Sequence, residues 1–194
     1  MSDSTKTVQQ SPTILVNHFD EDSVKRFKEE FFRLMDDEFI PIVAIYVDSY
    51  GGEIHSLLAM VDIMTSRTEK PVATIALGKA MSCGSILLAC GSDGLRFAGP
   101  NSTIMIHEVS AMNWGTLADL KNNLKEVERL NTVVFKILEA KCKQKSGYFQ
   151  NLIKNNKQQD LYFTANQSKK HRIVDVIGMP KIEFGTAFHI SWLK

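Results

Sequence analysis

The sequence has few cysteines, no long apolar run and almost no net charge, and each of these features excludes a class of protein. Only three of its 194 residues are cysteine, an odd number without CxxC spacing, which fits a reducing compartment better than a disulfide-stabilised secreted domain. No apolar run approaches the ~20 residues of a membrane span, and the polar start of the chain lacks the apolar core of a signal peptide. We therefore expect a cytoplasmic protein.

Charge balance and glycine spacing exclude further ligand classes. Lys and Arg total 23 against 22 Asp and Glu, so the chain lacks the basic surplus expected of a protein that binds nucleic acid or a membrane surface. The G-x-G-x-x-G dinucleotide motif is absent, and Gly78-Lys79 is followed by Ala80 rather than by the serine or threonine of a P-loop. We expect no cofactor, no metal site and no ATP hydrolysis by this chain itself.

Short β-branched runs alternate with helical periodicities, which is the pattern of an α/β fold. Strands are predicted at 13–16, 42–47, 72–77 and 103–107, with one or two more within 173–177 and 181–193. Helices are predicted from Asp20 or Asp22, from about Ile54, and over 85–90. Residues 1–11 are polar and are expected to form a flexible arm, which leaves 12–194 as a single domain.

A long helix is predicted from about 116 to 146. Its apolar positions form a continuous stripe at helical spacing, namely Leu117, Leu120, Leu124, Val127, Leu130, Val134, Ile137 and Leu138. Roughly thirty helical residues span ~45 Å, which exceeds what the core of one domain this size requires. We therefore expect part of the stripe to pack against another chain, and a two-helix hairpin within the chain is the alternative.

The segment around Ser82 is a candidate nucleophile site. Ala80 and Gly84 flank Ser82 in a small-x-Ser-x-small pattern between a strand and a helix, as a sharp turn that exposes a hydroxyl requires. The start of the following helix offers free N–H groups that can hold an oxyanion. The alternative is that Ser82 is only the N-cap of that helix.

A serine nucleophile needs a base and an acid that orients the base. Of the five histidines, His107 ends a predicted core strand, where the carboxyl ends of parallel strands meet at one crevice. The alternative for His107 is a hydrogen-bonded histidine at a sheet edge. Asp160 precedes the apolar stretch 161–163 and is a candidate for the acid, although it is one of 22 acidic residues. Gly51-Gly52 follows another buried strand, so its N–H groups can approach a substrate or an oxyanion closely.

Four segments in one order resemble the ClpP family, the proteolytic subunit of the ATP-dependent Clp protease: DSYGGEIHSLLAMVDIM, GKAMSCGSILLACG, PNSTIMIHEV and QQDLYFTA. The resemblance is collinear from about Pro12 to Asp175. It implies a ClpP/crotonase-like fold, a repeated β-β-α core with a protruding long handle helix. It also implies heptameric rings that stack in pairs into a closed chamber, and an endopeptidase that cuts unfolded chains delivered by a separate AAA+ unfoldase.

The resemblance also implies roles for individual residues. Ser82 matches the family nucleophile, His107 its general base and Asp160 its orienting acid, and the backbone N–H groups at Gly52 and Cys83 match the oxyanion hole. The residues expected to flank an extended substrate are Tyr50, Gly51, Glu108 and Val109. The chain departs from the family pattern at Tyr50, where proline is usual, and at Cys83, where methionine is usual. Gln158-Gln159 replace the charged pair that usually links the rings.

Two alternative functions stay open on the sequence. A crotonase-like acyl-CoA enzyme would share this type of core and a glycine-built oxyanion hole, but it would use carboxylates rather than a serine, histidine and aspartate. A non-catalytic ring subunit would shape or regulate the chamber of a partner; the altered ring contacts favour that interpretation, and the intact set of serine, histidine and aspartate argues against it.

Overall fold

The computed structural model describes residues 13–110, 114–157 and 160–181. The predicted arm at 1–11, the pair Gln158-Gln159 and the strand predicted within 181–193, apart from Lys181, lie outside these ranges. The division into an arm and a single domain therefore remains a prediction.

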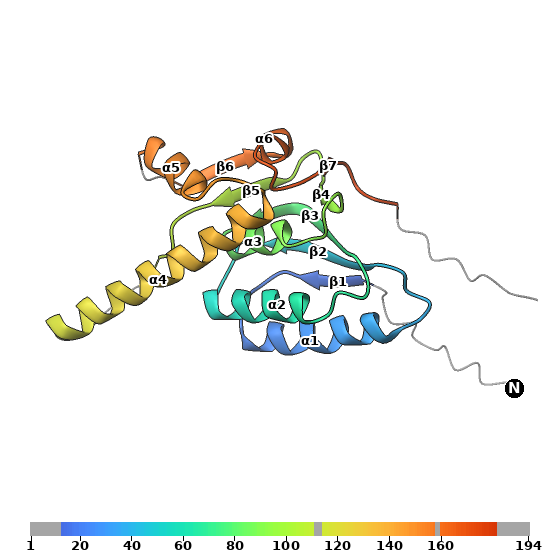
Figure 1. Ribbon diagram of the computed structural model, residues 1–194, viewed down its shortest axis with the longest axis horizontal. Coiled ribbons are helices and arrows are strands. Elements are labelled where there is room, and N and C mark those ends of the chain that lie inside the picture. The colour runs from blue at the N-terminus through green and yellow to red at the C-terminus, as the bar shows by residue number, and fades with distance from the viewer. Residues whose placement is uncertain (1–12, 111–113, 158–159, 182–194) are drawn as a thin grey trace, which may run out of the picture.

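The core is a seven-stranded, mostly parallel sheet. Its strands are β1 (Thr13–Val16), β2 (Val43–Ser49), β3 (Val72–Met81), β4 (Arg96–Ala98), β5 (Thr103–Ile106), β6 (Leu161–Thr164) and β7 (Val176–Ile177). The order β1-β2-β3-β4-β7 is parallel throughout, β5 pairs parallel with the far end of β3, and β6 closes that end as an antiparallel strand beside β5 (Figure 1).

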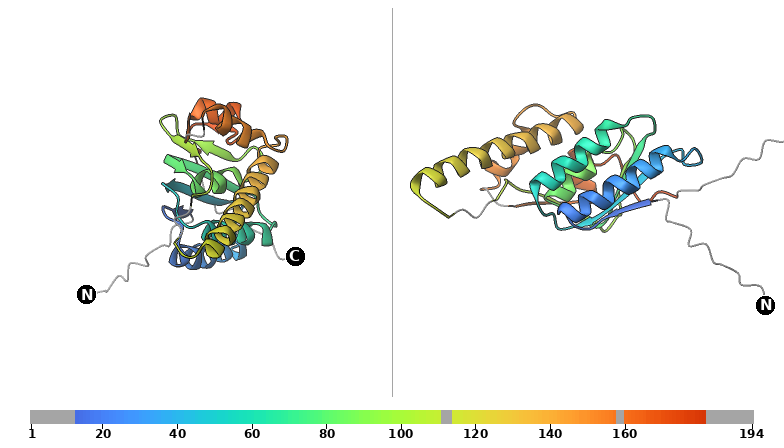
Figure 2. Two further views of the ribbon diagram at one scale, coloured as in Figure 1. Left: turned by 90° about the vertical axis from the view of Figure 1, so that its left-hand side faces the viewer. Right: turned by 90° about the horizontal axis from the view of Figure 1, so that it is seen from below.

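Six helices complete the described part of the chain. They are α1 (Glu21–Asp36), α2 (Ile54–Ser66), α3 (Cys83–Ala89), α4 (Leu117–Lys141), α5 (Tyr148–Asn155) and α6 (Ala165–Lys170). Helices α1 and α2 lie side by side on one face of the sheet (Figure 2), and they bury the apolar residues that the three- and four-residue spacing had placed on one side of each helix. The predicted α/β class with a parallel sheet and one long helix is confirmed.

Most predicted boundaries hold within a few residues, and the differences are informative. Asp20, not Asp22, is the N-cap of α1, because its carboxylate accepts the N–H of Ser23 at 2.7 Å. The short helix begins at Cys83 rather than at residue 85, and the strand predicted at 103–107 ends at Ile106. The three-residue strand β4 was not predicted, because so short a run shows no alternation.

The third strand is longer than predicted because it continues past a bulge. The register runs Val47 to Ala76 and then Ser49 to Ala80, so β3 carries extra residues around Gly78, whose φ is +77°. Beyond the bulge β3 extends to Met81 and pairs with β5. The bulge therefore carries the end of β3 toward the strand that precedes His107.

Helix α4 is one continuous helix that starts at a capping box formed by Thr116 and Asp119. Its second half is packed into the fold through Leu130, Val134, Phe135 and Leu138, whereas its first half projects from the molecule (Figures 1 and 2). Leu117 is 69% exposed and Leu124 is 57% exposed. The apolar stripe is thus only half buried among the described residues. No helix of the described ranges is long and apolar enough to cross a membrane.

An ion pair between a buried arginine and a partly buried aspartate ties the end of α4 to β4 and to the segment before β7. Arg96 is 4% exposed; it donates from Nε to Asp175 Oδ2 at 2.8 Å and from Nη1 to the carbonyl of Lys141 at 2.8 Å. Asp175 Oδ2 also accepts the N–H of Gly94 at 2.9 Å. Burial opposes ionisation of Asp175, but the hydrogen bond and charge of Arg96 outweigh it and lower the pKa of Asp175.

We expect Asp175→Asn to lower the free energy of unfolding at neutral pH by about 3 kcal/mol, because it leaves the Arg96 charge buried without its partner. A carboxyl with a lowered folded pKa contributes stability above its unfolded pKa of ~3.9 and loses that contribution as the pH falls through the folded pKa. The stabilities of the wild type and the variant, measured by urea denaturation, should therefore draw closer as the pH falls below about 4. The matched control is Asp93→Asn, whose ion pair with Lys143 is exposed and should matter little. Equal losses in both variants would contradict a structural role for the buried pair.

Candidate active site

Ser82 stands at a sharp turn between β3 and α3. Its backbone has φ +52° and ψ −120°, a strained conformation for a residue with a side chain. The N–H of Ser82 donates to the carbonyl of Met105 at 2.9 Å, so the turn is tied to β5. The Ser82 side chain makes no capping hydrogen bond, which removes the reading of Ser82 as only an N-cap.

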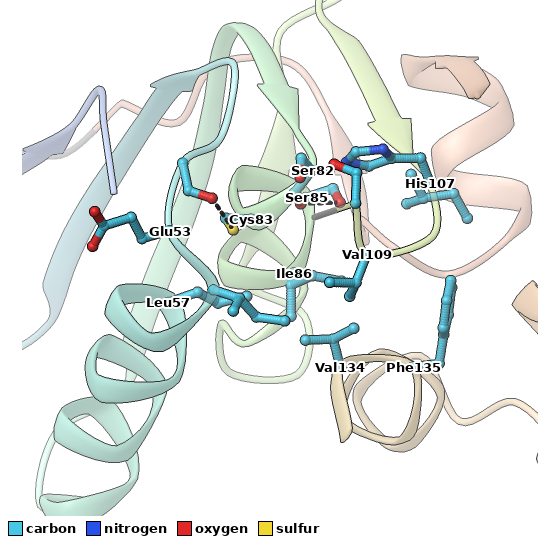
Figure 3. A pocket seen from close by; sticks show the side chains of 14 residues that line it. Glu53, Leu57, Ser82, Cys83, Ser85, Ile86, His107, Val109, Val134 and Phe135 are labelled. Carbon is cyan, nitrogen blue, oxygen red and sulfur yellow. Dashed lines mark hydrogen bonds between the residues drawn. The ribbon is translucent and has the colours of Figure 1, made fainter. Parts of the chain in front are cut away.

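His107 is hydrogen-bonded to Ser82. The distance between His107 Nε2 and Ser82 Oγ is 2.7 Å, and Figure 3 shows the imidazole beside the serine at the top of a cavity. Lys79 to Met81 of β3 pair in register with Thr103 to Met105 of β5, so the two strands deliver Ser82 and His107 to the same end of the sheet. The contact agrees with His107 as a general base and also with the alternative of a hydrogen-bonded histidine at a sheet edge.

Asp160 lies next to His107 because of the antiparallel pairing of β5 and β6. Ile106 is opposite Leu161, so the following pair in the same register is His107 and Asp160. Asp160 Oδ1 is 3.8 Å from His107 Nδ1, and the Asp160 side chain is 49% exposed. The three predicted residues therefore meet, with a short serine–histidine contact and a longer histidine–aspartate contact.

The Gly51-Gly52 turn packs directly against Ser82. A Cβ added to Gly51 would lie 2.8 Å from Ser82 Cβ, and one added to Gly52 would collide with the backbone of Phe19. Both glycines have positive φ, +114° and +152°, which residues with side chains rarely adopt. The turn needs glycine at both positions, as the close approach predicted from the sequence requires.

Cys83 follows Ser82 as the first residue of α3, and its side chain contacts the same turn. It is buried, and its thiol donates to the carbonyl of Gly52 at 3.4 Å, the contact drawn as a dashed line in Figure 3. Burial raises the pKa of the Cys83 thiol, so the thiol is neutral rather than a reactive thiolate at neutral pH. The Cys83 side chain thus supports the turn, and its backbone N–H lies at the start of α3 near Gly52.

A cavity of about 200 Å³ opens beside the serine and histidine. Apolar side chains from four separate parts of the chain line its depth: Leu57 of α2, Ile86 of α3, Val109 after β5, and Val134 and Phe135 of α4 (Figure 3). Sequence reasoning had assigned Val134 to the apolar stripe of the long helix and had not foreseen its place at the site. No periodic signal distinguishes a cavity wall from a core position.

Of the four predicted substrate-flanking residues, Val109 lines this cavity, whereas Tyr50, Gly51 and Glu108 are outside its lining. Tyr50 is 75% exposed, and Lys79 Nζ lies 4.5 Å from the centre of its ring. Glu108 is exposed, whereas the Val109 N–H is occupied by Asn131 Oδ1 of α4 at 3.0 Å. Asn131 was not predicted, and it links the segment after His107 to the long helix.

Among the described residues, no group of three or more His, Cys, Asp or Glu side chains is arranged so that it could hold a metal ion. His171 lies instead in an aromatic cluster, with its Nδ1 2.9 Å from the hydroxyl of Tyr148.

Comparison with known proteins identifies relatives of the chain. The sequence profile of the family described as Clp protease matches residues 2–181. The chain is 31% identical over 172 residues to an ATP-dependent Clp protease proteolytic subunit 1 of Streptomyces avermitilis, which covers 89% of this chain and 77% of that protein. It is 31% identical over 135 residues to a proteolytic subunit 2 of Frankia casuarinae, covering 70% of this chain and 60% of that one.

Two glycine substitutions test the close packing at Gly52. Gly52→Ala should destabilise the protein by about 2–4 kcal/mol, because the new methyl group meets the Phe19 backbone as well as a disfavoured φ. Gly94→Ala has a positive φ of +82° but open space around the new methyl, and should cost only about 1 kcal/mol. Guanidinium denaturation of both variants separates the cost of the disfavoured φ from the cost of the clash. Similar losses in the free energy of unfolding would argue against close packing at Gly52.

Proposed function

The chain belongs to the Clp protease family, and on that premise we propose that it is a serine endopeptidase that hydrolyses peptide bonds of unfolded polypeptides. The observation that carries the proposal is the 2.7 Å contact between Ser82 Oγ and His107 Nε2, beside a glycine turn and an apolar cavity. A hydroxyl in contact with an imidazole is the arrangement that acyl transfer to serine requires.

In the first half of the reaction Ser82 Oγ attacks the carbonyl carbon of the scissile peptide, and His107 Nε2 accepts the hydroxyl proton. The carbonyl oxygen becomes an oxyanion, for which the N–H groups of Gly52 and Cys83 are the proposed donors. Collapse of the tetrahedral intermediate breaks the C–N bond, and His107 returns the proton to the leaving amine. The product is an acyl-enzyme on Ser82.

In the second half water attacks the acyl-enzyme with His107 again as the base, and the released carboxylic acid restores Ser82. Asp160 is proposed to hold the imidazole in the tautomer with hydrogen on Nδ1 and to stabilise its charged form. A direct hydrogen bond requires the 3.8 Å contact to shorten to about 2.8 Å. Because the Asp160 side chain is half exposed, such a shift meets little packing resistance.

The cavity suggests which peptide bonds are cut. Its walls are the apolar side chains Leu57, Ile86, Val134 and Phe135, so a side chain that enters beside Ser82 gains by leaving water if it is apolar. We propose cleavage after apolar residues. Tyr50, Gly51, Glu108 and Val109 are proposed to flank the extended substrate. The Val109 N–H can receive substrate only if Asn131 releases it.

The alternatives have weaker support. Membership of the Clp protease family favours a peptide substrate over an acyl-CoA, and the serine–histidine contact has no role in a carboxylate-based mechanism. A non-catalytic ring subunit has no use for a strained serine turn that costs stability. Both observations support the peptidase.

The exposed surfaces suggest the assembly. The protruding half of α4 exposes Leu117 and Leu124, which we propose to be covered by other copies of the chain in a heptameric ring that stacks into a tetradecamer. An apolar row also crosses the sheet in register, on residues Leu15, Tyr46, Ile75, Phe97 and Val176. Leu15 and Val176 at its ends are exposed and Ile75 at its centre is buried, so the two ends of the row are the proposed docking surface for an AAA+ unfoldase or a neighbouring subunit.

A fluorophosphonate probe, which reacts with activated serines, tests the nucleophile. We expect label on the wild type, none on Ser82→Ala, and label on Cys83→Ala, since the oxyanion contribution of Cys83 comes from its backbone. His107→Ala should slow labelling by about 100-fold or more, because it removes the base. Label that persists in Ser82→Ala and disappears in Cys83→Ala would transfer the nucleophile to the thiol.

Native mass spectrometry tests the assembly. We expect the 21.8 kDa chain to appear as heptamers or multiples of them, and Leu117→Asp combined with Leu124→Asp to dissociate the stacked form, because each places a charge on the exposed apolar stripe. Asn122→Asp adds a charge to the opposite side of α4 and serves as the control. A wild type that stays monomeric at micromolar concentration would contradict the proposed role of α4.

A further inference from the structure

We propose that Ser49 is a positioning residue, whose buried hydroxyl holds the Gly51–Gly52 peptide so that the Gly52 N–H faces the reacting carbonyl. The inference rests on the proposed function and deepens it, since it assigns to a side chain the orientation of one oxyanion donor. Ser49 is the last residue of β2 and is fully buried, at 0% exposure.

The Ser49 hydroxyl binds both polar groups of Gly51. Its Oγ accepts the N–H of Gly51 at 3.0 Å and donates to the carbonyl of Gly51 at 3.4 Å. A hydroxyl has one hydrogen to donate and lone pairs to accept, so both contacts can exist together. The Gly51 carbonyl and the Gly52 N–H belong to one planar trans peptide and point in opposite directions. A side chain that fixes the carbonyl therefore fixes the direction of the N–H.

The orientation of the peptide between Gly51 and Gly52 depends on external contacts. With no Cβ on either side, no side chain of its own residues restricts its rotation, and both flanking φ angles are positive. The next peptide is already held at both ends, because the Glu53 N–H donates to Phe19 O at 2.8 Å and the Cys83 thiol donates to Gly52 O at 3.4 Å. Phe19 and Gly52 also form an isolated parallel bridge.

Different contacts hold different peptides of the turn. Phe19 and Cys83 secure the peptide after Gly52, the Phe19 bridge spans Gly52 on both sides, and the Ser49 hydroxyl supplies the side-chain contact to Gly51. Without the Ser49 hydroxyl, the buried Gly51 N–H loses its partner, and rotation of the peptide becomes the way to recover one. The Phe19 bridge remains, so the expected effect is a partial loss of orientation.

The test is Ser49→Ala, compared with the wild type in cleavage of a short peptide that has an apolar residue before the cut. Removal of a whole oxyanion donor costs about 10²- to 10³-fold in kcat, and a donor that is only misdirected part of the time should cost about 10- to 50-fold. KM should change little, because the contact is made in the transition state. Affinity for a peptide boronic acid, which forms a tetrahedral adduct on serine, should fall by the same factor as kcat/KM. Affinity for a cleaved product peptide should not.

Two further variants guard against a simple folding defect. Ser168→Ala removes another fully buried serine hydroxyl, which donates to Thr164 O at 2.9 Å on α6, and should leave kcat and boronate affinity unchanged. Ser49→Cys retains a weak donor and acceptor of similar shape and should recover part of the loss. The pH profile of kcat/KM should be the same in all variants, since the base is unaltered.

Each outcome bears on one claim. A wild type that neither cleaves the peptide nor reacts with the fluorophosphonate defeats the proposed function. An active wild type with an equally active Ser49→Ala defeats the role of Ser49 alone. A Ser49→Ala variant that loses product affinity as much as boronate affinity, or that loses activity only in proportion to its folded fraction, also overturns the inference, because both mark a general structural defect.

Discussion

The hydrogen bond from the Ser82 N–H to the carbonyl of Met105 is the contact on which the geometry of the candidate site depends. It joins the end of β3 to β5 at the point where one strand turns into a helix and the other runs on to His107. With the two backbones fixed there, a 2.7 Å approach of hydroxyl and imidazole needs no long-range adjustment. The strained φ of Ser82 persists because the strands on either side hold the turn in place.

A second constraint is the crowding at the glycine turn. Gly51 touches Ser82, Gly52 touches Phe19, and Gly84 packs against Val47 and Ser49, so β2, β3 and the start of α3 meet with almost no side-chain bulk between them. Such close approach brings backbone N–H groups near a hydroxyl without any cationic side chain. Backbone dipoles held in a fixed orientation stabilise developing negative charge more effectively than reorienting solvent does.

Much of this arrangement could be predicted from the sequence, because strand ends of a parallel sheet converge and the residues at those ends are few. Ser82, His107 and the glycine pair were found in this way. Asp160 depended on family resemblance, since its place follows from the pairing of β6 with β5 and no local pattern announces that pairing. Ser49 and Asn131 were missed because a buried serine after an apolar strand and an asparagine on a helix have no distinctive spacing. Their roles appear only when the groups they bind are in view.

The placement of His107 beside Asp160, at the end of the β5–β6 ladder, has a consequence for how this chain can vary. Between the two residues the polypeptide leaves the sheet, forms α4 and α5, and returns, so insertions or deletions in that excursion change loop and helix lengths without altering which residues face each other. A single-residue deletion within β6 itself would instead exchange the positions of its two faces and turn the carboxylate away from the imidazole. Homologous chains are thus free to diverge in length between these elements, while the four-residue ladder has to keep its alignment.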